Sequence, residues 1–124
     1  MMTSLMRTGL LAGALFLTAA GAHAASYNCA KATHPDEIAI CRSTTLSELD
    51  VRMATLYGVR MKVPMLMGSR GAAQDEQAEF LAKRAACGAR TACLATAYQQ
   101  RIDALKQEID TAMQDYCVKL GICG

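Results

Sequence analysis

The sequence predicts an all-α fold, a small disulfide-reinforced helical bundle or hairpin of three to four helices with a long C-terminal helix. One observation behind this prediction is a pair of segments with apolar residues at helical spacing, which meet at a loop bracketed by Cys87 and Cys93. A disulfide there would staple two antiparallel helices at their turn. The other is that six cysteines occur in 124 residues, an even number typical of a disulfide framework in a short exported chain.

Residues 1–24 have the features of a secretory signal peptide. Arg7 is followed by an apolar run over residues 10–20 and by the small-residue end Ala22-His23-Ala24, which predicts cleavage before Ala25. The apolar run is shorter than the roughly 20 residues that span a bilayer, although a retained N-terminal anchor is the alternative. Cys29 does not directly follow the cleavage point, so no lipid anchor is expected.

Residues 25–124 are then one small domain that holds all six cysteines. Thirteen Lys and Arg residues against eleven Asp and Glu residues give the chain a formal net charge of +2. This near balance indicates neither a nucleic-acid surface nor electrostatic membrane binding. Because disulfides form in oxidising compartments, we expect a periplasmic or secreted protein with no membrane anchor after cleavage.

Two helices are expected in the first half of the domain. Pro35 and the two acids after it suit the first turn of a short helix that ends near Arg42. A second helix follows a cap at Thr44 or Thr45 and ends before Pro64, because the residue preceding a proline disfavours helical geometry. The apolar stripe of this helix is Leu46, Leu49, Met53, Leu56 and Met61.

Residues 64–71 are predicted to form a loop. Met61, Met65 and Met67 gather in and just before it. Thioethers bind copper(I) and also make adaptable contacts, so a soft metal site and a contact surface are two functional interpretations. Ordinary filling of a helical core is the interpretation we favour, because the spacing of the methionines is irregular.

The second half is predicted to hold a helix over residues 72–86, stopped by Gly88, and a long helix from Thr91 or Ala92 towards Tyr116. The long helix has apolar residues in alternating steps of four and three, the spacing of a coiled-coil seam. The seam residues are Tyr98, Ile102, Leu105, Ile109, Ala112 and Tyr116. This helix is expected to be the spine of the fold.

Proximity along the chain favours three local disulfides among the 15 connectivities that six cysteines allow. The predicted pairs are Cys29 with Cys41, Cys87 with Cys93, and Cys117 with Cys123. The first would tie the N-terminal segment to the first helix, and the third would close a terminal turn. Closing a loop as short as the first is worth about 3 kcal/mol in the chain-entropy model.

No catalytic constellation stands out, so the protein is predicted not to be an enzyme and to use no metal or cofactor. His34, which precedes Pro35, is expected to be a solvated residue at a helix start. The cysteines lack the C-x-x-C spacing of thiol oxidoreductases and zinc ribbons. Paired acids at residues 36–37 and 75–76 lie near helix starts, where negative charge favours the helix dipole.

A set of residues and spacings resembles the LprI family of small exported domains. The matching positions are Cys29, Ala39-Ile40-Cys41, Leu49-Asp50, Tyr57, Gln77, Phe80-Leu81, Arg84, Cys87-Gly88, Cys93-Leu94, Tyr98 and Arg101-Ile102. They fall within residues 28–106, and the third cysteine pair lies outside them. Phe80 stands where the family has Trp, and Ala85 stands where it has an acidic or amide residue.

The resemblance implies a helical domain of the cell envelope, in a family whose named member inhibits lysozyme. Such an inhibitor must fill a cleft that holds two carboxyl groups, which a rigid loop with basic and hydroxyl groups would suit. Two segments fit this description, one with Arg90 and Thr91 inside the second bridge and one with Ser69 and Arg70. These four are the predicted partner-binding residues, and for both arginines a solvated surface position is the alternative.

Asp50 and Arg84 match the family positions and lie on stripes that are otherwise apolar. We therefore predict a largely buried ion pair between the second and third helices. Together these observations lead us to expect an exported protein that binds a protein partner, with lysozyme as the first candidate. A structural module that pairs through the seam of the long helix is the alternative, and a methionine-based metal carrier is a third interpretation.

Overall fold

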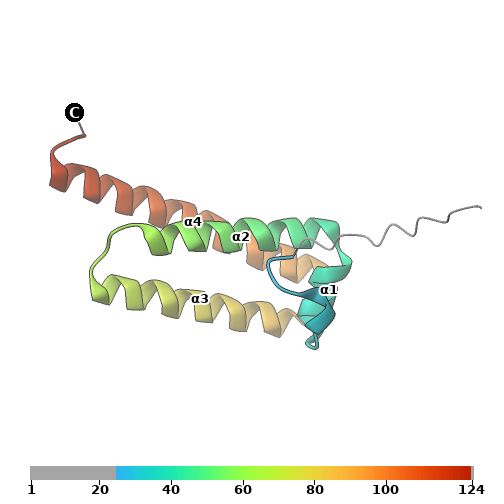
Figure 1. Ribbon diagram of the computed structural model, residues 1–124. Coiled ribbons are helices and arrows are strands. Elements are labelled where there is room, and N and C mark those ends of the chain that lie inside the picture. The colour runs from blue at the N-terminus through green and yellow to red at the C-terminus, as the bar shows by residue number, and fades with distance from the viewer. Residues whose placement is uncertain (1–24, 124) are drawn as a thin grey trace, which may run out of the picture.

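The computed structural model describes residues 25–123 as an all-helical protein (Figure 1). Its elements are the 3₁₀ turn η1 (Cys29–Lys31) and the helices α1 (Pro35–Arg42), α2 (Thr44–Lys62), α3 (Met67–Cys87) and α4 (Thr91–Leu120). The predicted fold class and the long C-terminal helix are confirmed. The predicted signal peptide, residues 1–24, lies outside the described residues.

Successive helices among α2, α3 and α4 are antiparallel, and α1 lies across one end of them (Figure 1). Helix α4 packs mainly on α2 and secondarily on α3. We call the end with η1, α1 and the α3–α4 turn the closed end. The opposite end, formed by residues 63–66 and the last turns of α4, is the open end.

Side chains at the helix starts satisfy backbone donors that have no partner within the helix. The carboxylate of Glu37 accepts a hydrogen bond from the backbone N–H of His34 at 3.4 Å, ahead of α1. The hydroxyl of Ser43 accepts one from the N–H of Leu46 at 3.3 Å. Ser43 is therefore the cap of α2, and the prediction that one of the two following threonines caps it was wrong.

Helix α3 begins at Met67, well ahead of the predicted residue 72. Ser69 and Arg70 are therefore helical, and the predicted loop with these residues at its flexible end is wrong. The guanidinium of Arg70 donates to the carbonyl of Met61 at 2.9 Å, which links the first turn of α3 to the last turn of α2. Glycines at positions 68 and 71 suggested a loop, but each costs only about 1 kcal/mol inside a helix, which tertiary contacts can offset.

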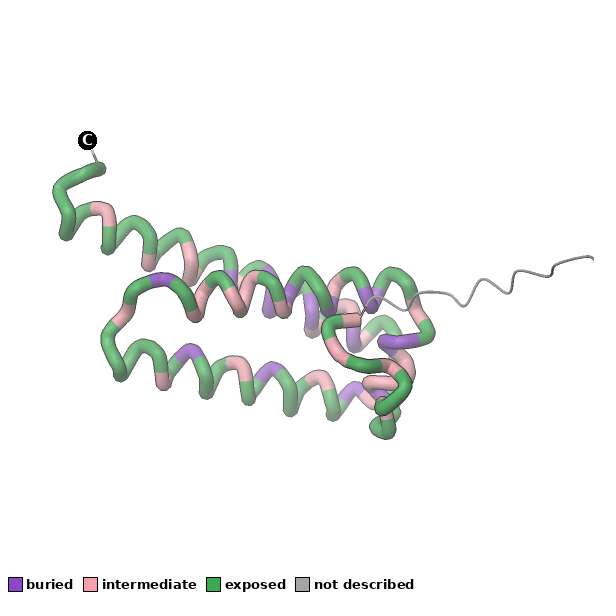
Figure 2. The backbone as a smooth tube through the Cα atoms, viewed as in Figure 1, coloured by how far each residue is buried: buried purple, intermediate pink, exposed green. Residues whose placement is uncertain are grey.

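The hydrophobic core is built around the first residues of the apolar seam predicted for α4. Tyr98 and Leu105 are 0% exposed and Ile102 is 3% exposed, and α2 and α3 contribute Leu46, Met53 and Phe80 to the same cluster. The rings of Phe80 and Tyr98 lie with their centroids 5.3 Å apart, a tilted arrangement favoured by aromatic quadrupoles. In Figure 2 the buried positions face the interior of the three long helices and become rare towards the open end.

All three predicted disulfides are present, Cys29–Cys41, Cys87–Cys93 and Cys117–Cys123, and no described cysteine is free. The first fixes η1 to α1, and the second closes the α3–α4 turn, where Gly88 has a φ of 56°. The third closes the C-terminal end of α4, where Gly121 has a φ of 65°. Three disulfides fit an oxidising environment outside the cytoplasm.

Candidate functional site

The open end is where the fold leaves its longest helix uncovered. Helix α4 has 30 residues and α2 has 19, which correspond to about 45 Å and 28 Å. Helix α4 therefore runs past the connection between α2 and α3 (Figure 1). Along the seam, exposure rises from 0% at Leu105 to 38% at Tyr116. We call residues 111–123 the α4 tip.

Exposed apolar side chains concentrate at this end. Leu66 is 78% exposed and Met67 is 88% exposed, both at the connection that faces the tip. The tip contributes Met113, Tyr116, Val118, Leu120 and Ile122. Exposed apolar side chains that gather at one end of a small protein are candidates for an interaction site.

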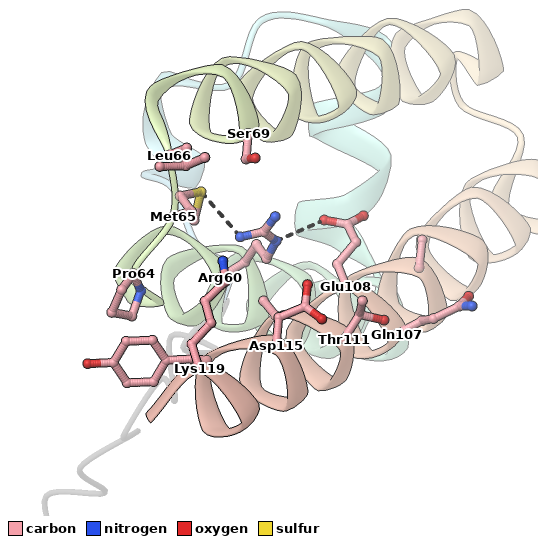
Figure 3. Close-up of a pocket in the computed structure, with 13 residues that line it drawn as sticks. Arg60, Pro64, Met65, Leu66, Ser69, Gln107, Glu108, Thr111, Asp115 and Lys119 are labelled. Atoms are coloured by element: carbon pink, nitrogen blue, oxygen red, sulfur yellow. Dashed lines mark hydrogen bonds and ion pairs between the residues drawn. The ribbon is translucent and has the colours of Figure 1, made fainter. Parts of the chain in front are cut away.

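A cavity of about 530 Å³ lies between the α2–α3 connection and α4 (Figure 3). Its lining is mixed, with apolar groups from the connection and polar groups from α4. The lining residues are Arg60, Pro64, Met65, Leu66, Ser69, Ala104, Gln107, Glu108, Thr111, Ala112, Asp115, Tyr116 and Lys119. Ser69, predicted as a binding residue, is therefore in this cavity, which we call the wedge cavity.

Charged side chains from α2 and α4 contact one another beside the wedge cavity. Arg60 of α2 lies with its Nε 3.5 Å from Oε2 of Glu108 on α4, and its Nη1 donates to the sulfur of Met65 at 3.2 Å (Figure 3). Glu108 also accepts a hydrogen bond from Nη1 of Arg101 at 2.9 Å. Arg101 in turn donates from Nε to the amide oxygen of Gln77 on α3 at 3.1 Å. These contacts join α2, α3 and α4 at the point where the apolar core ends.

The pairing at this end is incomplete. Among the described residues, three buried atoms lack a partner in hydrogen-bond geometry: Arg60 Nε, Arg101 Nη2 and Glu108 Oε2. A second carboxylate, Glu76, lies 3.7 Å from Arg101. Burial raises the pKa of Glu76, and the nearby Glu108 carboxylate raises it further. Two carboxylates thus share the guanidinium of Arg101.

The two predicted binding segments lie at opposite ends of the molecule. Arg70, which donates to the carbonyl of Met61 in the last turn of α2, lies next to Ser69 at the open end. Arg90 and Thr91 are at the closed end, where Arg90 donates from Nε to the carbonyl of Cys87 at 3.0 Å and from Nη2 to that of Ala86 at 3.2 Å. Two donor groups of Arg90 are thus engaged by the end of α3, and its interaction with a partner carboxylate would compete with those bonds.

The methionine side chains make separate contacts. Met67 is exposed to solvent, and the sulfur of Met65 accepts the hydrogen bond from Arg60. The sulfur of Met53 accepts one from the amide of Gln77 at 3.2 Å. Among residues 25–123 no group of three or more His, Cys, Asp and Glu side chains could hold a metal ion.

The predicted pair of Asp50 with Arg84 was wrong. Nε of Arg84 lies 2.8 Å from Oδ2 of Asp36 on α1, and Nη2 lies 3.9 Å from Glu37. Asp50 instead accepts a hydrogen bond from the hydroxyl of Tyr98 at 2.8 Å. Asp36 and Asp50 are both almost fully buried. The acids after Pro35 were predicted only to favour the start of a helix, so the contact of Asp36 with another helix was not expected.

The phenol of Tyr98 lies in the electrostatic field of both Asp50 and Arg84. Burial raises the pKa of its phenol strongly, and Asp50 raises it further, whereas Arg84 opposes the shift. Burial also raises the pKa of Tyr27, to about 12. The guanidinium of Arg84 lies 5.8 Å from the centroid of the Tyr27 ring, within the range of a cation–π contact. The closed end is therefore held by two groups of polar contacts, one that joins α2 to α4 through Asp50 and Tyr98 and one that joins α1 to α3 through Asp36 and Arg84.

Sequence reasoning missed the group formed by Arg60, Glu108 and Arg101 beside the wedge cavity. A signal existed for Arg101, because it adjoins Ile102 on the seam and a buried cation there requires an acid. Glu108 lies one helical turn past Leu105 and could have been identified as that acid. Arg60 carries no comparable signal, since its position near the end of a helix also suits an exposed cation.

No protein-family model, no curated protein and no solved structure matches this chain. The resemblance to the LprI family thus stays a prediction from individual residues. None of the helices within residues 25–123 has the length and apolar character needed to cross a membrane.

Proposed function

We propose that this protein is exported to the periplasm or secreted, and that it acts by binding a protein partner at its open end rather than by catalysis. The observation that carries this proposal is the α4 tip, which projects beyond the bundle with apolar side chains on its surface. The terminal disulfide closes the tip, so little conformational entropy would be lost when a partner binds it.

The partner we propose is a lysozyme-type glycoside hydrolase. Its active site is a concave cleft with two carboxyl groups, so a binding partner must offer a convex, preorganised insert. The tip projects beyond the α2–α3 connection (Figure 1), and its residues Tyr116 and Lys119, which line the wedge cavity, offer a hydroxyl and an ammonium group. This choice also rests on the resemblance to the LprI family, and it moves the expected contact from Arg90 to the tip.

One charge at the tip opposes such binding. Asp115 precedes Lys119 by one helical turn and also lines the wedge cavity. A carboxylate at this position would repel the acidic cleft, whereas Lys119 would be attracted to it. Removing the charge of Asp115 should therefore strengthen binding, and removing that of Lys119 should weaken it.

The experiment measures inhibition of lysozyme by purified residues 25–124 and by variants. We expect Tyr116→Ser combined with Leu120→Ser to weaken inhibition by about tenfold or more, since buried aromatic and aliphatic anchors dominate interface energies. Lys119→Ala should weaken it less, and Asp115→Asn should strengthen it. The matched control is Val51→Ser with Leu81→Ser, which removes two apolar side chains of similar exposure elsewhere and should leave inhibition unchanged.

Arg90→Ala distinguishes the closed end from the open end. If Arg90→Ala abolishes inhibition while helical circular dichroism is preserved, the contact lies at the α3–α4 turn and the tip assignment is wrong. If the wild-type protein does not inhibit lysozyme at all, the proposed partner is wrong.

A second candidate function is self-assembly through paired α4 tips. It is favoured by Asp115 and Lys119, because antiparallel pairing of two identical helices about residue 117 would place each of these charges opposite the other. Sedimentation at increasing protein concentration tests it. A dimer that is lost in Asp115→Lys and restored by mixing with Lys119→Asp would support assembly, and a monomer at all concentrations would exclude it.

A further inference from the structure

Asp50 is a buried carboxylate whose partners are neutral. It is 1% exposed on α2, and its Oδ1 accepts a hydrogen bond from the hydroxyl of Tyr98 at 2.8 Å. Its Oδ2 accepts one from the backbone N–H of Ser26 at 2.6 Å. Within residues 25–123 no Lys, Arg or His nitrogen lies within salt-bridge distance of Asp50. An ionised carboxylate in this position is costly without a counter-ion.

Asp36, the other buried acid of the closed end, has a cationic partner. It is 2% exposed, as deeply buried as Asp50, and it has the guanidinium of Arg84 at 2.8 Å. Arg84 is committed to Asp36 and, more distantly, to Glu37. One of the two buried acids of the closed end thus has its cation from a side chain, and the other does not.

The residue beside the Asp50 contact is Ala25, the first residue after the predicted cleavage point. Ala25 is partly buried and packs against the core. Standard bond lengths place the nitrogens of consecutive residues about 3 to 3.6 Å apart, so the nitrogen of Ala25 lies within about 6 Å of Oδ2 of Asp50. This nitrogen is a neutral amide in the precursor and an amine in the cleaved chain.

We propose that removal of the leader supplies the counter-ion of Asp50. A leader protease hydrolyses the Ala24–Ala25 peptide bond, in which water adds a hydroxyl to the carbonyl carbon of Ala24 and a proton to the nitrogen of Ala25. The amine then takes up a further proton from solvent at neutral pH and pairs with the carboxylate of Asp50. An opposite charge within about 4 to 6 Å favours the ionised form of both groups.

The pairing makes the mature protein more stable than any form that keeps leader residues. It anchors the N-terminal segment to α2 through Asp50 and, through Tyr98, to α4. Stability is therefore completed by cleavage, after the chain has crossed the membrane. The proposal adds to the proposed function and does not depend on which partner binds the open end.

A double-mutant cycle tests the pair. Residues 25–124 with a free amino terminus and residues 23–124 are compared by urea unfolding, each with Asp50 and with Asp50→Asn. With Asp50, the two added residues should raise the unfolding equilibrium constant by about tenfold, since a part-buried ion pair is lost. With Asn at position 50, the same extension should change it by less than about twofold. Equal changes in both backgrounds would overturn the proposal.

Nα-acetylation of the 25–124 chain is the second arm, and it serves if Asp50→Asn does not fold. The stability advantage of the free amine should be complete below about pH 7.7, its ordinary pKa, and should disappear as pH rises through the higher pKa of the paired amine. Asp50 acts electrostatically on Tyr98 and Tyr27, which are also influenced by Arg84, Asp36 and Glu37, and none of these five groups is of a type that titrates near pH 8. A free and an acetylated chain with the same pH profile, or an exported protein whose mass shows a start other than Ala25, would overturn it.

Discussion

The closed and open ends of the bundle use charged residues in different ways. At the closed end, Arg84 bonds Asp36 and Tyr98 bonds Asp50, so each buried acid has a partner from another helix. At the open end, Arg60 and Glu108 lie 3.5 Å apart without hydrogen-bond geometry, beside a cavity and an apolar tip. A fully bonded network stabilises one arrangement, whereas buried polar atoms without a hydrogen-bond partner lower the stability of the end that holds them.

The largest expected effect is at the closed end. Arg84→Met should destabilise the protein by about 3 to 5 kcal/mol, because it leaves Asp36 buried without its cation. Urea unfolding measures the change. The neighbouring Lys83→Met is the matched control, since Lys83 makes an exposed pair with Glu79 and should change stability by less than about 0.5 kcal/mol. Equal midpoints for the two variants would show that the buried pair of Arg84 with Asp36 contributes no more than the exposed pair of Lys83 with Glu79.

Tyr98→Phe should have an intermediate effect. It removes the hydroxyl that donates to Asp50 and should cost about 1 to 3 kcal/mol. The corresponding Tyr116→Phe at the open end should be neutral, because Tyr116 is exposed. If both substitutions cost the same amount, the Tyr98 hydroxyl has no special role.

The same variant has a signature at alkaline pH. The folded state holds the phenolic protons of Tyr98 and Tyr27 more tightly than the unfolded state, whose tyrosines titrate near pH 10. Stability should therefore fall as pH rises from 10 to 12. The fall should be shallower in Tyr98→Phe, as measured by urea midpoints across this pH range, and an unchanged slope would contradict the assignment.

The smallest effect is expected where two carboxylates share Arg101. Burial and Glu108 raise the pKa of Glu76, so its ionisation near neutral pH opposes folding. Glu76→Gln should raise the melting temperature slightly at pH 7, and the difference should vanish below about pH 4, where the acid is protonated in both states. Glu79→Gln is the control with the opposite sign, because its hydrogen bond to Lys83 lowers the pKa of Glu79. A lower melting temperature for Glu76→Gln at pH 7 would show that attraction to Arg101 dominates.

The sequence allowed prediction of the elements whose cause is local. Helical spacing located α4, Pro64 bounded α2, and neighbouring cysteines identified the three bridges. The start of α3 was wrong because the contact that supports it, from Arg70 to the end of α2, joins two elements. The partner of Arg84 was wrong for the same reason. Burial of Arg84 was apparent from its apolar stripe, but the choice between Asp50 and Asp36 depends on where α1 crosses the bundle.

The candidate site could be predicted only in part. Ser69 was identified, and it lines the wedge cavity. The exposure of Tyr116 could not be inferred from the seam, because the pattern of α4 continues unchanged past the point where α2 ends. How far a partner helix reaches is set by the position of Pro64 and the packing angle, which a repeat in one helix does not encode.

The order of the disulfides along the chain has a consequence for biogenesis. Each cysteine is bonded to the next one in sequence, with separations of 12, 6 and 6 residues. A chain that is threaded N-terminus first into an oxidising compartment exposes its thiols in that same order. If each thiol is oxidised with the following one as it emerges, the native connectivity results at once, and no isomerase has to correct it. If the protein is exported as proposed, its oxidation can thus keep pace with translocation, before the long helices have assembled.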